Sequence, residues 1–114
     1  MQLLVIVLNK TELLEDILEA LEENGIRGAT ILDSKGMASE LGEHDDFRFF
    51  SSLRLVLNPD HKENKTIFMV VRDEEVETIS KLVNHINGGF ENPDTGILFT
   101  VPVSHAEGLI KKSC

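Results

Sequence analysis

The sequence from residue 65 to residue 103 is KTIFMVVRDEEVETISKLVNHINGGFENPDTGILFTVPV, and it decides the fold. Apolar residues run almost continuously at 65–71 and at 96–103, which is typical of buried strands, and they recur at helical spacing across 73–87. Asp73 is a candidate N-cap of that helix, and the glycines at 88 and 89 end it. The segment therefore predicts a strand, a helix and a second strand.

The first part of the chain repeats this order. QLLVIVL at 2–8 predicts a strand, 11–24 predicts an amphipathic helix capped by Asn9 or Thr11, and RGATILD at 27–33 predicts another strand. Two such units in series predict an α+β fold, the ferredoxin-like βαββαβ arrangement, in which a four-stranded antiparallel sheet carries both helices on one face. A chain of 114 residues is expected to form a single domain, 1–114.

A long loop, 35–63, separates the second and third predicted strands, and a tail, 104–114, follows the last strand. A compact domain does not need so long a connection there, so we expect the loop to carry function. Three of the six phenylalanines lie in it. Because disordered segments are poor in aromatic residues, part of the loop is expected to pack or to dock. The candidate partner-binding residues are Phe47, Phe49, Phe50, Leu53 and Arg54.

Composition narrows the class of protein. A net charge of −9, with 41% hydrophobic and 27% charged residues, argues against nucleic-acid binding, which needs clustered Lys and Arg. No stretch reaches the roughly eighteen apolar residues that span a bilayer, and residues 3–8 lack the basic lead-in and cleavage site of a signal peptide. Cys114 is the only cysteine, so no internal disulfide can form. We expect a cytoplasmic protein without direct membrane insertion.

The segment order, the chain length and the position of the loop resemble the PII nitrogen-regulatory signal-transduction family and its PII-like relatives. The most specific match is GAT at 28–30 followed by SKGM at 34–37, which is similar to the family's second strand and the start of its T-loop. NGI at 24–26 and TGILF at 95–99 add support.

The resemblance implies a homotrimer that binds a small effector in the clefts between subunits. An adenine nucleotide (ATP, ADP or AMP) is one candidate for the effector, and no cofactor is certain. It also implies that the long loop regulates a partner protein, such as a transporter or a metabolic enzyme. The implied ligand-binding residues are Thr30, Lys35, Gly36, Met37, Ala38, Lys65, Gly88, Gly89 and Phe90.

The chain departs from the family pattern where phosphates would bind. The segment 88–96 has no Lys or Arg and carries Glu91 and Asp94, which would repel a triphosphate unless a metal intervened. No arginine follows the last predicted strand, and the chain has no tyrosine to uridylylate. Basic groups could instead come from Lys35, Lys65, Arg27 or Lys111. Two interpretations of 88–96 stay open, an anion-binding loop and a helix C-cap followed by a turn.

Other functions are weighed against this one. The chain has four histidines without metal-ligand spacing; His44 beside Asp45 and Asp46 is a minor candidate, so no metal site is assigned. The scaffold is shared with divalent-cation tolerance proteins, which keeps a metal-binding protein as an alternative. A ligand-independent interaction module built on 47–57 is another. No Gly-x-Ser-x-Gly elbow, Walker loop or zinc-binding helix is present, so an enzyme is not expected and no catalytic residue is named.

Overall fold

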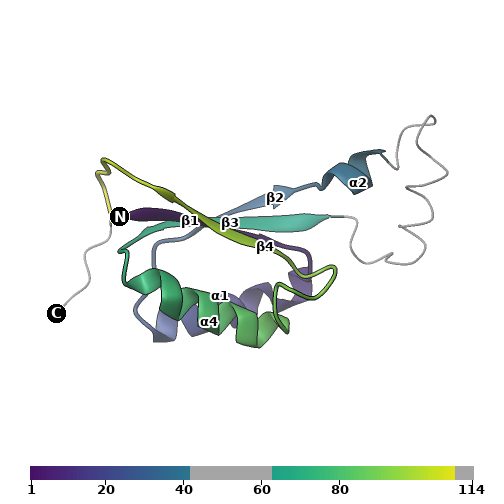
Figure 1. The fold of residues 1–114 in the computed structure, drawn as a ribbon, viewed down its shortest axis with the longest axis horizontal. Helices are drawn as coiled ribbons and strands as arrows, with labels where there is room; N and C mark the ends of the chain where they lie inside the picture. The colour runs from purple at the N-terminus through teal and green to yellow at the C-terminus, as the bar shows by residue number, and fades with distance from the viewer. Residues whose placement is uncertain (42–62, 110–114) are drawn as a thin grey trace.

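A computed structural model describes residues 1–41 and 63–109 of the chain. One sheet carries the two long helices on a single face, and a short helix stands beyond one end of the sheet (Figure 1). In chain order, the elements are β1 (Gln2–Leu8), a 3-10 turn (Thr11–Leu13), α1 (Leu14–Glu23), β2 (Thr30–Ser34), α2 (Met37–Leu41), β3 (Asn64–Val71), α4 (Glu75–Asn87) and β4 (Gly96–Pro102).

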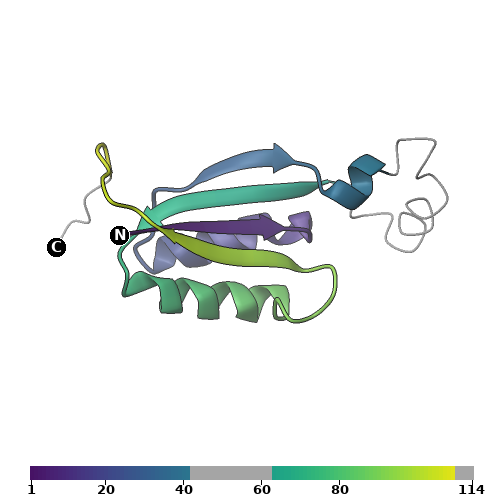
Figure 2. The same ribbon diagram turned by 45° about the horizontal axis from the view of Figure 1, so that its top comes forward.

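The sheet has four strands in the order β2-β3-β1-β4, and every neighbouring pair is antiparallel. The central strand, β1, therefore pairs with both β3 and β4, while β2 and β4 form the two edges. This order and the helices on one face confirm the predicted α+β, ferredoxin-like arrangement (Figure 2).

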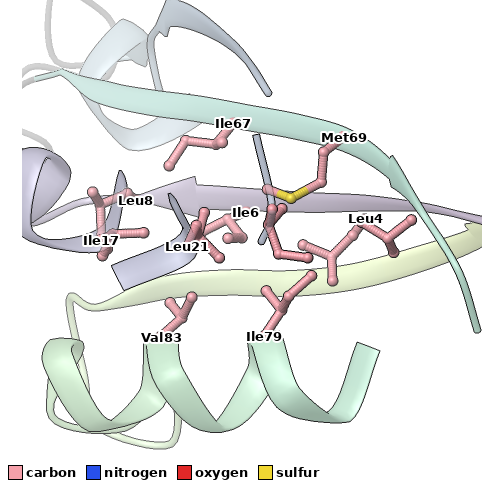
Figure 3. Packing of buried hydrophobic residues seen from close by; sticks show 11 residues of the cluster. Leu4, Ile6, Leu8, Ile17, Leu21, Ile67, Met69, Ile79 and Val83 are labelled. Atoms are coloured by element: carbon pink, nitrogen blue, oxygen red, sulfur yellow. The ribbon is translucent and has the colours of Figure 1, made fainter. Parts of the chain in front are cut away.

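The helix-covered face of the sheet holds the core. Every second residue of β1 and β3 points toward the helices, and Leu4, Ile6 and Ile67 are all fully buried. In Figure 3 these side chains meet those of α1 and α4 across the layer. The buried hydrophobic cluster consists of Leu4, Ile6, Leu8, Ile17, Leu21, Ile26, Ile67, Met69, Val71, Ile79 and Val83. Burying one such side chain stabilises the fold by about 1.5–3 kcal/mol.

The opposite face, which we call the open face, is also apolar. The register puts Val5 of β1 between Phe68 of β3 and Phe99 of β4. Neither long helix covers this side (Figures 1 and 2). Ile97 is 55% exposed and Phe99 44% exposed. The apolar residues of the open face are Leu3, Val5, Val7, Leu32, Phe68, Val70, Ile97, Phe99 and Val101.

The first helical segment begins differently from the prediction. It opens as a 3-10 turn, and neither Asn9 nor Thr11 caps it with a side chain. The reason is that Asn9 is held in a turn against the start of β4: its N–H donates to the Thr95 carbonyl at 3.3 Å, and its own carbonyl accepts from Thr11 N–H at 3.0 Å.

Asp73 is likewise not the N-cap of the second helix. The cap position is Glu74, without a side-chain hydrogen bond. Asp73 instead pairs with the Met1 ammonium group at 3.1 Å and accepts a hydrogen bond from Gln2 Nε2 at 3.2 Å. The first turn of α4 is tied down by Glu75, whose carboxylate accepts from Arg72 N–H at 2.9 Å.

Two further boundaries differ from the prediction. The second strand begins at Thr30, three residues after the predicted position 27. After α1 the chain first packs into the core at Ile26, which is 8% exposed, and the strand begins only four residues later. The predicted loop 35–63 begins with the helix α2, whose first turn closes through Glu40 N–H to the Gly36 carbonyl at 3.0 Å. No helix or strand follows Pro102 in the described part of the tail, 103–109.

Candidate functional site

Apart from Thr30, which lies opposite Phe68 near the middle of the sheet, the predicted ligand-binding residues lie at one end of the sheet but on opposite sides of it. Gly96 pairs with Leu8, Leu8 with Lys65, and Lys65 with Asp33, so these four positions form one row across the sheet. The start of the long loop lies at the β2 end of this row, and residues 88–95 lie at its β4 end (Figure 2). We call this side of the sheet the loop end.

The two edges cannot meet within one subunit. Strands in a sheet are about 4.8 Å apart, so the three spacings from β2 to β4 amount to roughly 14 Å. The structure therefore brings Lys35, Gly36 and Lys65 together at one edge, and Gly88, Gly89 and Phe90 at the other.

At the β2 edge the two lysines are already paired. Lys65 Nζ forms an ion pair and a hydrogen bond with Asp33 across the two strands. Lys35 Nζ lies 3.6 Å from the Glu40 carboxylate of α2. An anionic ligand at this edge would have to compete with carboxylates that the chain itself supplies.

The remaining residues at this edge differ in exposure. Thr30 is exposed on the open face opposite Phe68, and Met37 is 78% exposed. A Cβ added to Gly36 would make only an ordinary contact, 3.5 Å from Asn64 Nδ2. Close packing therefore does not require glycine there. Ala38 lies in α2, and the candidate partner-binding residues 47, 49, 50, 53 and 54 lie outside the described part of the chain.

A polar cluster that sequence reasoning missed closes the base of the long loop. The Ser34 hydroxyl hydrogen-bonds the Asn64 side-chain oxygen, and lies 2.7 Å from the hydroxyl of Thr66. These residues face one another only because Ser34 pairs with Asn64 in the sheet register. The last residue of β2 and the first of β3 are thus held together where the loop begins and ends.

At the β4 edge, residues 88–92, which we call the glycine segment, serve first of all as a helix cap. Gly88 adopts a left-handed conformation (φ 87°), and its N–H donates to the Asn84 carbonyl at 3.0 Å. Phe90 N–H donates to Asn84 Oδ1 at 2.9 Å, and Asn92 N–H donates to the Gly89 carbonyl at 3.1 Å. Three amides of 88–92 therefore already have partners inside the chain, which matches the helix-cap interpretation.

A lysine that sequence reasoning did not select lies beside this segment. Lys10 Nζ donates to the Asn87 carbonyl at 3.4 Å and lies 3.9 Å from the position that a Cβ of Gly88 would occupy. The topology could have indicated it, because Leu8 pairs with Gly96 in a ferredoxin-like sheet and the next residues must then border residues 88–95. Lys10 gives this edge a positive charge that 88–96 lacks.

Two polar side chains are buried beneath the glycine segment. Asn87 and Thr95 are each 1% exposed, and Asn87 Nδ2 lies 3.5 Å from the Thr95 carbonyl. Thr95 Oγ1 donates to the Asn92 carbonyl at 2.9 Å, whereas Asn87 Oδ1 has no hydrogen-bond partner among the described residues. This buried pair ties the end of α4 to the start of β4.

Neither edge assembles a metal site from described residues. Within 1–41 and 63–109, no group of three His, Cys, Asp or Glu side chains is placed to hold an ion. His105 pairs with Glu107 at 2.8 Å on the exposed segment after β4.

Within residues 1–41 and 63–109, no helix has the length and apolar character needed to cross a membrane.

Nearly the whole sequence matches a known family. The family described as nitrogen regulatory protein P-II matches residues 1–112, a range that includes both edges of the sheet and the long segment between β2 and β3. The chain therefore belongs to the P-II family of nitrogen-regulatory signalling proteins.

Proposed function

We propose that this protein is a cytoplasmic, homotrimeric regulator in which a small effector binds between subunits and biases the conformation of residues 35–63. That loop then engages or releases a partner protein, such as a transporter or a metabolic enzyme. The observation that carries the proposal is that, at one end of the sheet, Lys35, Gly36 and Lys65 lie by the β2 edge, whereas Gly88, Gly89 and Phe90 lie by the β4 edge.

The division favours a site shared by two subunits. Roughly 14 Å separates the two edges within one chain, but the β4 edge of one subunit can lie beside the β2 edge of the next in a ring. The open face supplies a reason for such a ring, because Ile97, Phe99 and Val101 are each at least 44% exposed. Contiguous apolar surface of this kind is typical of a protein interface.

The polar contacts at the β2 edge suggest how an effector would act on the loop. Lys35 pairs with Glu40 of α2, and Lys65 pairs with Asp33 of β2. A ligand group that drew either lysine away would change the restraint on α2 and hence on the start of the loop. The ligand shifts the loop only by the difference between its affinities for the two loop states.

The first test combines sedimentation with a ligand screen on the full chain. Analytical ultracentrifugation should give a trimer, and a monomer at micromolar concentration would overturn the proposal. Thermal unfolding should then be followed with adenine nucleotides, 2-oxoglutarate and amino acids, each with and without Mg²⁺. A ligand at about a hundred times its Kd should stabilise the fold by about 2.7 kcal/mol, a shift of several degrees.

Deletion of residues 39–60 separates the loop from the scaffold. We expect the deleted protein to remain a folded trimer and to lose its partner, because the buried hydrophobic cluster of the described residues lies in β1, β3, α1, α4 and their flanking residues. Failure of the deleted chain to fold would make the segment structural and would count against a regulatory loop.

A ligand-independent interaction module is the second candidate. The observation that favours it is the helix cap at Gly88, where several amides of the glycine segment already have partners within the chain. Under this alternative no small molecule changes the unfolding temperature, and the loop binds its partner equally well in all conditions.

A further inference from the structure

We propose that the effector is a zwitterion of the free amino-acid class, with its carboxylate held by Lys10 and its ammonium group held by Glu91 at the β4 edge. The inference rests on the proposed function, since it names the chemical class of the effector that binds there.

The β4 edge is poorly suited to a polyphosphate. A phosphate cradle needs several free backbone amides or several basic side chains, and the amides of Gly88, Phe90 and Asn92 are already hydrogen-bonded within the chain. The segment 88–96 contains no Lys or Arg. Its two acidic residues, Glu91 and Asp94, are both exposed, and their carboxylates would repel a bound polyphosphate.

Lys10 is suited to hold a single carboxylate. Its ammonium group is placed over Gly88 by the bond to the Asn87 carbonyl. A lysine ammonium has three donors, and this bond uses one of them. No carboxylate of the described residues lies within ion-pairing distance of Lys10, so its charge has no anionic partner in that part of the chain.

Glu91 provides the complementary charge next to it. Its side chain folds back over Gly89, where a Cβ would lie 3.7 Å from Glu91 Oε1. Among the residues described, this carboxylate takes part in no ion pair or hydrogen bond. Because Gly88 and Gly89 are adjacent, their Cα atoms are about 3.8 Å apart. The unpaired cation therefore lies beside Gly88, and the unpaired anion lies beside the next residue, Gly89.

The test is isothermal titration of the full chain with the twenty standard amino acids, ATP and 2-oxoglutarate. We expect at least one amino acid to bind, and both Lys10→Met and Glu91→Gln to weaken it tenfold or more. Lys81→Met and Glu19→Gln are the matched controls, because both remove an exposed helix charge away from this edge. They should leave the affinity within twofold.

Analogues of the bound amino acid assign each charge to its residue. The amine that lacks the carboxylate should be insensitive to Lys10→Met, and the acid that lacks the amino group should be insensitive to Glu91→Gln. Glu91→Lys should abolish amino-acid binding and raise the affinity for ATP.

Three results would overturn the inference. ATP or 2-oxoglutarate binding in place of every amino acid would do so while leaving the proposed regulator intact. An amino acid that binds equally well to both variants would place its site elsewhere. Absence of all binding to a protein that sediments as a trimer would also refute it, whereas a monomer would refute the proposed assembly itself.

Discussion

The two faces of the sheet have nearly the same composition but very different surroundings. On the covered face, Leu4, Ile6 and Ile67 are fully buried under α1 and α4. On the open face, Ile97, Phe99 and Val101 are as apolar but remain between 44% and 55% exposed. Strands buried on both faces have continuous apolar sequences instead of alternating ones, and β1, QLLVIVL, is of this kind. The comparison indicates that the strands are built for two covering layers, of which residues 1–41 and 63–109 supply only one.

Replacing the same residue type on each face tests this contrast most strongly. Ile67→Ala should destabilise the isolated subunit by about 2–5 kcal/mol, because a fully buried side chain leaves a cavity. Ile97→Ala should cost the isolated subunit less than about 1 kcal/mol, since 55% of Ile97 is exposed there. Urea unfolding at a concentration where assembly is suppressed measures both. Equal losses would mean that the open face is already covered within one chain.

The next largest effect is expected where β4 joins β1. Gly96 has φ 120°, and a Cβ on it would lie 1.8 Å from the Val7 carbonyl oxygen. Gly96→Ala must therefore push β4 away from β1 and disturb both faces together, at roughly 2–3 kcal/mol. Gly36→Ala is the control, because its Cβ would meet only Asn64 Nδ2 at 3.5 Å. Thermal unfolding should separate the two variants clearly, and similar melting temperatures would argue against the close strand contact.

A charge on the open face should separate assembly from folding. Phe99→Asp is expected to leave the unfolding free energy of the subunit within about 1 kcal/mol, because Phe99 is 44% exposed. The same change should convert trimers to monomers in sedimentation, since an unpaired carboxylate would be buried in the interface. Glu107→Gln, on the exposed segment after β4, should not alter assembly. A trimeric Phe99→Asp protein would show that the open face is not the interface.

The smallest effect concerns Asp73, which helps to hold the start of β1, the strand that pairs with both β3 and β4. Hydrogen bonds from the Met1 ammonium group and from Gln2, together with the charge of that ammonium, lower the pKa of Asp73 below 3.8. The folded pKa lies under the unfolded one, so the contribution to stability is present above about pH 4 and is lost as the pH falls through the folded pKa.

Asp73→Asn should thus lower the melting temperature slightly at pH 7. It should not change the melting temperature at a pH below the folded pKa of Asp73. NMR titration of the carboxyl carbon checks the direction of the pKa shift. A midpoint above 3.8 would contradict the contacts that Asp73 makes with Met1 and Gln2.

Much of the fold could be predicted from sequence because its signals are local. The apolar run at 2–8 and the helical spacing at 73–87 correspond closely to β1 and α4. The predicted N-caps were wrong where long-range contacts override the local signal. The Asn9 N–H donates a hydrogen bond to the Thr95 carbonyl. Asp73 forms an ion pair with the Met1 ammonium group and accepts a hydrogen bond from Gln2. No pattern in the neighbouring residues reveals such partners.

The candidate site was less predictable for the same reason. Gly88 and Gly89 can be picked out from sequence because two glycines after a helical segment indicate a helix end. Lys10 resembles any surface lysine until β1 is paired with β4. The polar cluster likewise joins Ser34 to Asn64 and Thr66, which lie 30 and 32 positions further along the sequence. Such residues can be found from sequence only after the strand register has been worked out.

The separation of the two edges of the sheet has a genetic consequence. In the proposed ring, each site takes its β4 edge from one chain and its β2 edge from the next. A variant defective only at Lys10 and a variant defective only at Lys35 would each have no working site alone. Mixed rings would regain one intact site wherever the sound β4 edge of one chain meets the sound β2 edge of the other. Two null alleles should therefore complement each other when expressed together, while two alleles with damage at the same edge should not.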